Sequence, residues 1–520
     1  MTRTNSYYIT TAISYTNGSP HLGHAYEAVI TDAMARFKRL DGYDVKFLTG
    51  TDEHGEKILT TAQSHGEDVA SFTERITQEF IKLAKDLNIS NDDFIRTTQN
   101  RHIKAAQYIW QKIYDAGDIY LDSYAGWYSV RDEAYFGEDE LKEGEDGYKY
   151  TADGARVIWK EEPSYFFKLS KYQDKLLELY QSQAEFITPE SRRNEIMSFV
   201  KGGLKDLSVS RTSFDWGVPV PNDPDHVMYV WLDALTNYIT AIGYPDTDSE
   251  GFMKYWPANC HVIGKDIIRF HTIYWPAFLM SAGIDLPQNV FAHGFINIEG
   301  QKMSKSVGNV LSPYDLIRDF GLDQTRYILL REVPHGQDGN FSRNHAIERI
   351  NSDLANGLGN LAQRTLSMIF KNCESQIPEP GTLTKEDQAL INKARKEMIP
   401  LLRDHMESFT IHKAIEVINE ISRDADGYID AQAPWKLKKE APERMKTVLY
   451  TLAETIRCLA VVMQPFTPQG ALKILDQLMV PQEQRMFEHV DESYALKPGT
   501  PIEKPSGVFP RIVENERAAE

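Results

Sequence analysis

The 520-residue sequence predicts an α/β domain on a parallel sheet, interrupted by a β-rich insertion and followed by an α-helical bundle. Three observations lead to this prediction. Strand-like, helix-like and strand-like runs follow one another near the N-terminus, which is the pattern of a βαβ unit and implies a parallel sheet. Aromatic and acidic residues mix from about residue 119. Beyond residue 345 the strand signals fade and long amphipathic segments follow.

The first βαβ unit is expected within residues 7–55. Residues 7–13 are rich in aromatic and β-branched side chains, as strands are, and Asn-Gly-Ser-Pro at 17–20 is typical of a turn. Ala25–Leu40 carries apolar residues at helical spacing, and residues 45–48 return to a strand. Ligands of such sheets bind at the carboxyl ends of the strands, so we expect a site near residues 14–24 and 49–55.

The middle of the chain changes character twice. Residues 56–117 are mostly helical by pattern, whereas 119–225 predict a small β-rich insertion with helices near 171–182 and 192–201. The sheet is expected to resume at 227–230. A further strand at 261–264 then runs into a helix at 267–280.

The remaining chain predicts the bundle. Its amphipathic segments, separated by Pro and Gly clusters at 377–381 and 465–468, are 344–370, 385–402, 411–428, 444–463 and 470–478. We therefore expect the α/β domain in two halves (1–118 and 226–300), the insertion at 119–225, a linking region at 301–345, and the bundle with an irregular C-terminal arm at 346–520.

Composition points to a soluble, cytoplasmic protein. No signal peptide and no apolar run of membrane-spanning length is found, and the three cysteines are far apart, which fits a reducing compartment. The net charge of −18 argues against a simple basic nucleic-acid binder. A local basic stripe on an acidic body is compatible with that charge.

Two short motifs carry the chemistry. His21 and His24 flank Gly23 where a strand gives way to a helix, and the N-terminus of a helix attracts phosphate. Lys302 and Lys305 lie in a glycine-flanked run that predicts a mobile cationic loop. Taken alone, the first motif favours a helix start with two satisfied surface histidines, and the second favours a solvated surface loop.

A carboxylate and two aromatic pairs form a second candidate set. Asp52 follows a strand and could bind an ammonium group, although local sequence favours a cap on the helix beginning near residue 56. Trp231 and Tyr238 are spaced to share a helix face, as are His271 and Trp275. Core packing is the usual role of such stripes. An aromatic-walled pocket would instead suit a thioether, at about 0.3–1.5 kcal/mol per sulfur–ring contact.

His-Leu-Gly-His early and Lys-Met-Ser-Lys-Ser late resemble the paired ATP-site motifs of class I aminoacyl-tRNA synthetases. With the aromatic pairs and the helical C-terminal region, nearly the whole chain resembles the methionyl-tRNA synthetase family of that class. The resemblance implies a Rossmann-like catalytic domain with a connective insertion, followed by an anticodon-binding bundle. The implied reaction is ATP-dependent attachment of L-methionine to tRNA(Met) through methionyl-adenylate, with release of AMP and pyrophosphate.

The resemblance also implies roles for individual residues. The methionine pocket would comprise Ala12, Ile13, Tyr15, Asp52, Trp231, Ala234, Leu235, Tyr238, Ile267, His271 and Trp275. The ATP site would comprise His21, Gly23, His24, Gly264, Asp266, Lys302 and Lys305. The catalytic set would be His21, His24, Lys302, Lys305 and Arg211, and the anticodon readers Asn360, Arg364 and Trp435. We expect the imidazoles and the ammonium groups to converge on one triphosphate.

Departures from the family pattern and rival functions complete the expectations. Ser14 and Leu235 occupy positions where many relatives have proline. No cysteine precedes residue 260, so we expect no structural zinc in the insertion. ATP with Mg²⁺, methionine and tRNA(Met) are the expected partners of a monomer with no membrane association. The rivals are another class I synthetase, a nucleotidyltransferase with a His-x-Gly-His site, and a tRNA-binding paralogue without catalysis.

Overall fold

The computed structural model describes residues 5–132, 134–144, 146–302, 311–334 and 336–513. Two compact units make up the chain. The first comprises residues 1–20 and 45–293, and the second comprises residues 21–44 and 294–520. The expected boundaries at residues 119, 226, 301 and 346 subdivide these units further and stay predictions.

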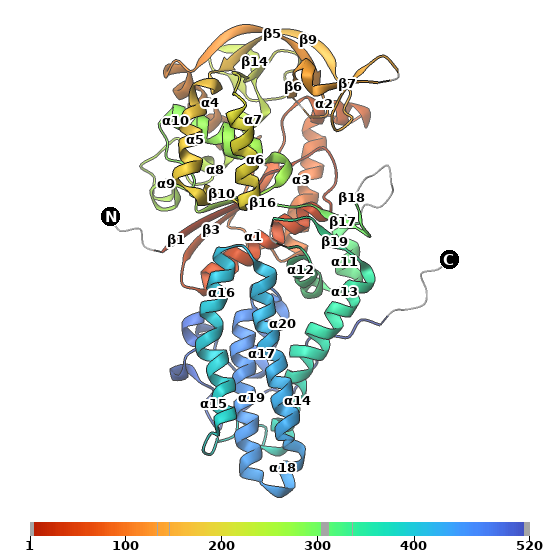
Figure 1. The fold of residues 1–520 in the computed structure, drawn as a ribbon, viewed down its shortest axis with the longest axis vertical. Helices are drawn as coiled ribbons and strands as arrows, with labels where there is room; N and C mark the ends of the chain where they lie inside the picture. Colours follow the sequence, from red (N-terminus) through yellow and green to blue (C-terminus); the bar gives the residue numbers. More distant parts are fainter. Residues whose placement is uncertain (1–4, 133, 145, 303–310, 335, 514–520) are drawn as a thin grey trace. The chain divides into compact units, whose positions relative to one another are not determined.

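The first unit is built on a seven-stranded sheet (Figure 1). Its strands, in spatial order, are β10 (Ile187–Thr188), β16 (Val290–His293), β15 (Cys260–Gly264), β1 (Ser6–Thr11), β3 (Asp44–Asp52) and β2 (Ser14–Tyr15), with β4 (Asp93–Arg96) also paired to β3. The ladders β1–β15, β15–β16, β2–β3 and β3–β4 are all parallel, which confirms the predicted parallel sheet. Their carboxyl ends therefore open on one edge, where ligands of such sheets bind.

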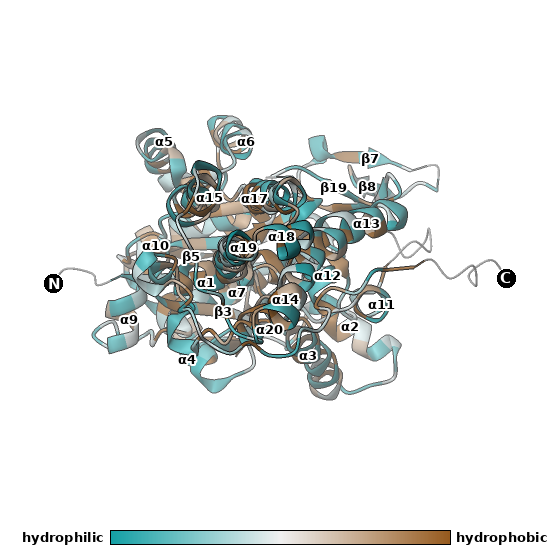
Figure 2. Ribbon diagram, turned by 90° about the horizontal axis from the view of Figure 1, so that it is seen from below, coloured by the Kyte–Doolittle hydropathy of each residue, from teal (hydrophilic) through white to brown (hydrophobic). Residues whose placement is uncertain are grey.

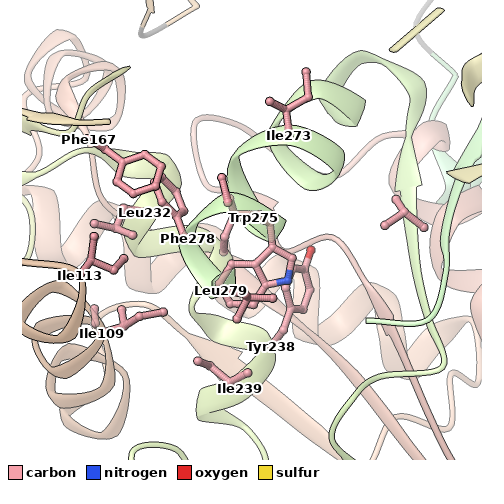
Figure 3. Close-up of a cluster of buried hydrophobic side chains, with 14 of the residues drawn as sticks. Ile109, Ile113, Phe167, Leu232, Tyr238, Ile239, Ile273, Trp275, Phe278 and Leu279 are labelled. Carbon is pink, nitrogen blue, oxygen red and sulfur yellow. The ribbon is translucent and has the colours of Figure 1, made fainter. Parts of the chain in front are cut away.

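Helices accompany the sheet and pack apolar faces into its core. They are α2 (Glu56–Ser64), α3 (Val69–Asp86), α4 (Asn100–Asp115), α5 (Gln173–Ser182), α6 (Glu190–Lys201), α7 (Val230–Leu235), α8 (Asn237–Thr240), α9 (Glu250–Tyr255) and α10 (Trp275–Ala282). Figure 3 shows part of the resulting core, in which Ile109 and Ile113 of α4 face Leu232 of α7 and Phe278 of α10.

The predicted β-rich insertion is confirmed. Its long ladder pairs β5 (Ile119–Ser129) with β9 (Ile158–Phe167), extended by β6 (Ala134–Phe136) and β11 (Leu207–Ser208). Two smaller sheets follow, β7 (Leu141–Glu143) with β8 (Lys149–Thr151), and β12 (Ser210–Arg211), β14 (Asp223–Met228) and β13 (Pro219–Val220).

The second unit contains the predicted helical bundle (Figures 1 and 2). Its helices are α13 (Arg343–Arg349), α14 (Asn360–Asn372), α15 (Lys385–Asn392), α16 (Met398–Glu407), α17 (Ile411–Gln432), α18 (Pro434–Glu440), α19 (Pro442–Met463) and α20 (Pro468–Gln477). The amphipathic segment expected over 344–370 is helical but not uniform. A π-helical segment, Ile350–Gly359, separates α13 from α14, because Gly357 leaves the helical conformation at φ −80° and ψ −118°.

The first helix of the predicted βαβ unit, α1 (Leu22–Leu40), belongs to this second unit. A fully buried ion pair, Asp32 to Arg326 at 2.7 Å, ties it to α12 (Leu322–Arg331). Phe37 packs edge-on against Phe487 with ring centroids 4.8 Å apart. The unit also holds α11 (Pro313–Phe320) and a small sheet of β18 (Gln301–Lys302), β17 (Ile296–Ile298) and β19 (Gly339–Phe341). No helix within the described ranges is both long and apolar enough to cross a membrane.

Candidate active site

Asp52 ends β3, directly beside Tyr15. The two residues are register partners in the β2–β3 ladder, and the Asp52 side chain is only 6% exposed. Thr16 donates to the Asp52 carbonyl oxygen from its backbone N–H at 3.0 Å and from its hydroxyl at 3.1 Å. The capping role favoured by local sequence is wrong, because α2 begins at Glu56 with Gly55 as its N-cap and no side-chain cap.

The aromatic pairs predicted from sequence come together. The ring of Tyr238 lies 5.7 Å from that of His271 and 6.1 Å from that of Trp275, and Trp231 lies edge-on to His271 at 6.2 Å. Figure 3 shows Tyr238 and Trp275 beside each other in the hydrophobic cluster. Trp231 is only partly buried and stacks on Phe270 at 3.7 Å. The four rings thus form a continuous aromatic surface.

The helices that carry these rings differ from the uniform helices expected. Trp231 lies on α7 and Tyr238 on α8, with a turn at Thr236 between them. The Thr236 N–H donates to the backbone carbonyl oxygen of Asp233, three residues back, at 3.1 Å. This bond is typical of a 3₁₀ turn rather than of an α-helix. His271 lies in a π-helical turn, Phe270–Tyr274, and such turns often occur at functional sites.

Most of the predicted methionine pocket belongs to one apolar cluster. Eight of its predicted members lie in that cluster or pack against it, namely Ala12, Ile13, Tyr15, Trp231, Leu235, Tyr238, Ile267 and Trp275. Ala234 is 3% exposed and precedes Leu235 on α7. The structure therefore places apolar side chains from distant parts of the predicted list in and against one core.

His271 is held as a neutral ring. Its Nδ1 lies 3.0 Å from the Ile267 carbonyl oxygen, so Nδ1 carries the proton and donates to it. Its Nε2 then accepts the hydroxyl of Tyr238 at 2.7 Å. Burial lowers the pKa of His271 to about 4, against a smaller opposing effect of the Ile267 hydrogen bond. A neutral imidazole adds no charge to a surface that would bind an uncharged side chain.

A buried polar group joins β3 to α7, and sequence reasoning missed it. The two carboxylate oxygens of Asp233 lie 2.7 Å from His54 Nδ1 and 2.7 Å from His102 Nε2. His54 follows the predicted ligand Asp52 by two residues, so its place in that stretch was the available signal. No local pattern indicated that His54 and His102 contact Asp233, from which they lie 179 and 131 residues away in sequence.

Gly264 and Asp266 lie where β15 ends. Gly264 is buried, and a Cβ there would lie 2.6 Å from Oδ1 of Asp266, so any larger residue would require the Asp266 side chain to move. Asp266 is exposed in the 3₁₀ turn that follows, Lys265–Ile267. A carboxylate at a strand end beside a bare backbone can bind the hydroxyls of a ribose.

Arg211 is buried within a cage of tyrosines. Its guanidinium lies 4.8 Å from the ring centroid of Tyr229, 5.1 Å from that of Tyr135 and 5.5 Å from that of Tyr128. Its Nη1 donates to the Ser208 hydroxyl at 2.8 Å and to the Ser210 carbonyl at 2.7 Å. The catalytic role expected for Arg211 stays a prediction.

The His-x-Gly-His motif begins α1 in the second unit. The N–H of Gly23 donates to Nδ1 of His21, and the N–H of His21 donates to Nδ1 of His24, both at 3.1 Å. Each Nδ1 therefore accepts, and in the neutral ring the proton lies on Nε2, which becomes the donor. The rings stack at 3.8 Å, and burial followed by the charge of His21 lowers the pKa of His24. Both imidazoles are thus oriented N–H donors at a helix N-terminus, as phosphate recognition requires.

The predicted cationic loop lies largely outside the described residues. The backbone of Lys302 pairs with Asn297 in the β17–β18 ladder, whereas Lys305 belongs to the 303–310 segment that the structure does not describe. The expected convergence of these lysines with His21 and His24 stays a prediction.

Helix α18, which carries the predicted anticodon reader Trp435, lies at one end of the bundle (Figure 1). Arg364 on α14 lies 5.5 Å from the ring centroid of Trp435, which follows Pro434 at the start of α18 and is 44% exposed. Arg364 Nη2 also donates to Asp430 at 2.9 Å. Asn360 is exposed one turn before Arg364. An exposed indole beside a guanidinium suits an unstacked base.

No group of three or more His, Cys, Asp or Glu side chains suited to a metal ion occurs in the described part of the chain. The residues present therefore offer no protein cage for Mg²⁺ there. The expected absence of structural zinc stays a prediction.

Family models and relatives match the chain along nearly its whole length. One family model, described as tRNA synthetases class I (M), matches residues 7–366, and another, the anticodon binding domain of methionyl tRNA ligase, matches residues 377–520. The methionine–tRNA ligase of Rhizobium meliloti (strain 1021) is 57% identical over 516 residues, which are 99% of this chain and 100% of that relative. The Mycobacterium bovis enzyme is 54% identical over 510 residues, covering 97% and 98%.

Solved structures agree with these matches. Mycobacterium tuberculosis methionyl-tRNA synthetase in complex with methionyl-adenylate has a TM-score of 0.95 and 54% identity, covering 98% of this chain and 100% of that chain. Its apo form has a TM-score of 0.89 and 51% identity, covering 98% and 99%. The shared sequence, the shared fold and the aromatic site lead to one conclusion: the chain belongs to the methionyl-tRNA synthetase family.

Proposed function

We propose that the protein attaches L-methionine to tRNA(Met) at the expense of ATP, through methionyl-adenylate. The observation that carries this function is the aromatic surface of Trp231, Tyr238, His271 and Trp275, which lies in and against the same apolar cluster as Tyr15, the register partner of Asp52. Asp52 would bind the methionine ammonium, and the rings would contact the thioether.

We assign ATP binding to the two sequence motifs and to the residues that follow β15. His21 and His24 would donate Nε2–H bonds to phosphate, and Gly23 at the helix start lets a flat base approach the backbone. Gly264 and Asp266 would bind the nucleoside. Lys302 and Lys305 would neutralise the charge that builds on the leaving pyrophosphate. Mg²⁺ would enter bound to the phosphates of ATP, where it neutralises part of their charge.

The reaction has two steps that need orientation and charge neutralisation more than a protein nucleophile. A methionine carboxylate oxygen attacks the α-phosphorus, the bond to the β-phosphate oxygen breaks, and pyrophosphate leaves. The 2′-hydroxyl of the terminal tRNA adenosine then attacks the methionyl carbonyl, and AMP leaves. Asn360, Arg364 and Trp435 would read the anticodon.

The test is ATP–pyrophosphate exchange with each of the twenty standard amino acids, followed by aminoacylation of total tRNA. Exchange stimulated by methionine alone, with charging confined to tRNA(Met), is the expected result. Stimulation by an aliphatic amino acid or by cysteine would instead identify a different class I enzyme. Adenylylation of a small molecule without tRNA charging would identify a nucleotidyltransferase.

A further inference from the structure

Asp233 collects two imidazoles from distant parts of the first unit. His54 comes from the end of β3 and His102 from α4, and each lies 2.7 Å from one carboxylate oxygen. Asp233 and His102 are completely buried, and His54 is 6% exposed. Burial alone would raise the pKa of this carboxyl, but His54 and His102 outweigh it and lower the pKa to about 2. The group is therefore a charged, fully engaged carboxylate within the core.

The segment that carries His54 is also held by hydrogen bonds that do not involve Asp233. The carboxylate of Glu53, between Asp52 and His54, accepts hydrogen bonds from Arg96 Nε at 2.7 Å and from Thr77 at 2.7 Å. Its carbonyl oxygen accepts the indole N–H of Trp216 at 2.6 Å. The end of β3 is thus fixed from several directions.

The other side is a short helix that packs into the core. Helix α7 is six residues long, and its N-cap, Tyr229, makes no side-chain capping bond. So short a helix is not stable by itself and takes its position from tertiary contacts. Trp231, Ala234 and Leu235, three of the predicted methionine contacts, surround Asp233 on this helix.

We propose that Asp233 is a positioning residue for methionine, which fixes the α7 side of the pocket relative to Asp52 at the end of β3. The carboxylate does not contact the substrate in this proposal. It acts through the two imidazoles, and so sets the distance between the ammonium-binding carboxylate and the aromatic and aliphatic wall. The proposal deepens the proposed function and rests on it.

Matched histidine variants test the proposal because each imidazole uses a known nitrogen. Asparagine can replace the Nδ1 donor of His54 and glutamine the Nε2 donor of His102, whereas leucine removes the donor at similar volume. In methionine-dependent ATP–pyrophosphate exchange, His54→Leu, His102→Leu and Asp233→Asn are expected to raise the KM for methionine about tenfold, the scale of one buried charge-assisted bond. The KM for ATP should change by less than about twofold. His54→Asn and His102→Gln should stay near wild type.

Asp118→Asn is the matched control. Asp118 is also buried, at 2% exposure, and accepts bonds from Tyr172 and Ser281, but it makes no bond to α7. The Asp118→Asn variant should have lower thermal stability and an unchanged KM for methionine. The proposal is overturned if the leucine and amide variants have the same methionine KM, or if Asp118→Asn raises it equally. The histidine pairs decide the matter if Asp233→Asn does not fold. A wild-type enzyme without methionine-dependent exchange would refute the proposed function itself.

Discussion

His271 is the side chain whose protonation the structure fixes most directly. Its Nδ1 donates to Ile267 and its Nε2 accepts from Tyr238, so neither nitrogen is arranged to take up a proton near neutral pH. A ring with one donor and one acceptor contact is also fixed in orientation, since a flip would place ring carbons at both contacts and break both hydrogen bonds. The aromatic surface therefore contains a neutral imidazole with one protonated and one unprotonated nitrogen in fixed positions.

The pH dependence of stability follows from this pKa. The folded-state pKa of about 4 lies below the ordinary 6.5, so between these values the unfolded state binds more protons and stability falls as pH decreases. The loss from this group should reach roughly 2 kcal/mol at pH 5 relative to pH 7.5. Thermal unfolding at both pH values measures it, with His271→Asn as the variant that should show a smaller difference. NMR of labelled histidines should find no His271 titration above pH 6, and a midpoint near 6.5 would contradict this account.

Trp435 is expected to contribute to tRNA binding alone. Its exposed ring beside Arg364 is placed to stack on a base, and such stacking is worth about 1–3 kcal/mol. Trp435→Ala should therefore raise the KM for tRNA roughly 5- to 150-fold in aminoacylation while methionine-dependent exchange is unchanged. Leu472→Ala, which removes another exposed apolar side chain of the same unit, is the control and should alter neither value. A defect in exchange would show that Trp435 affects adenylate formation as well.

At the scale of the element, the first turn of α1 depends on the absence of a side chain. A Cβ on Gly23 would lie 2.9 Å from Cε1 of His21, so the capping ring would have to move. Alanine nevertheless favours helix by about 1 kcal/mol. Gly23→Ala should thus leave thermal stability nearly unchanged and lower kcat/KM for ATP in exchange about tenfold.

The matched control for this change is Gly427→Ala within α17. A Cβ there meets nothing within 4 Å, so the same helix preference acts without a displaced ring. That variant should retain wild-type exchange. Equal losses in both variants would mean that the displaced imidazole is not the cause.

Periodicity and turn signals were enough to predict the bounds of helices whose ends are determined by their own residues. The start of α2 near residue 56, the helices near 171–182 and 192–201, and α19 over 442–463 agree closely with periodicity and turn signals. They were not enough where tertiary contacts decide. The π-helical segments and the break at Thr236 replace single expected helices, and the Asp233 connection joins residues more than a hundred positions apart. Of the predicted site, the resemblance supplied the residues expected to contact substrate, but local sequence did not indicate that His54 and His102 contact Asp233.

At the scale of the molecule, an acidic chain is expected to act on a polyanion. The net charge is −18, so contact with tRNA must depend on local cations such as Arg364 rather than on the overall charge. Long-range electrostatic attraction between the protein and tRNA is therefore expected to be weak, and recognition should depend on a few aromatic and guanidinium contacts.

The whole protein is expected to be active without zinc. The first 259 residues contain no cysteine, and the described residues hold no cluster of metal ligands. Elemental analysis of purified enzyme should find zinc far below one atom per chain. Treatment with a zinc chelator, followed by assay in excess Mg²⁺, should leave methionine-dependent exchange intact. Stoichiometric zinc lost together with activity would contradict this expectation.

The two nitrogens of His21 have unlike consequences for the enzyme. Nδ1 accepts the Gly23 N–H at the start of α1, so the proposed contact with ATP would use Nε2. Asparagine can replace the accepting atom but does not reach the position of Nε2. On the proposed role, His21→Asn should keep wild-type thermal stability and lose most methionine-dependent ATP–pyrophosphate exchange. The contribution of His21 to the start of α1 can therefore be separated from its proposed contribution to activity.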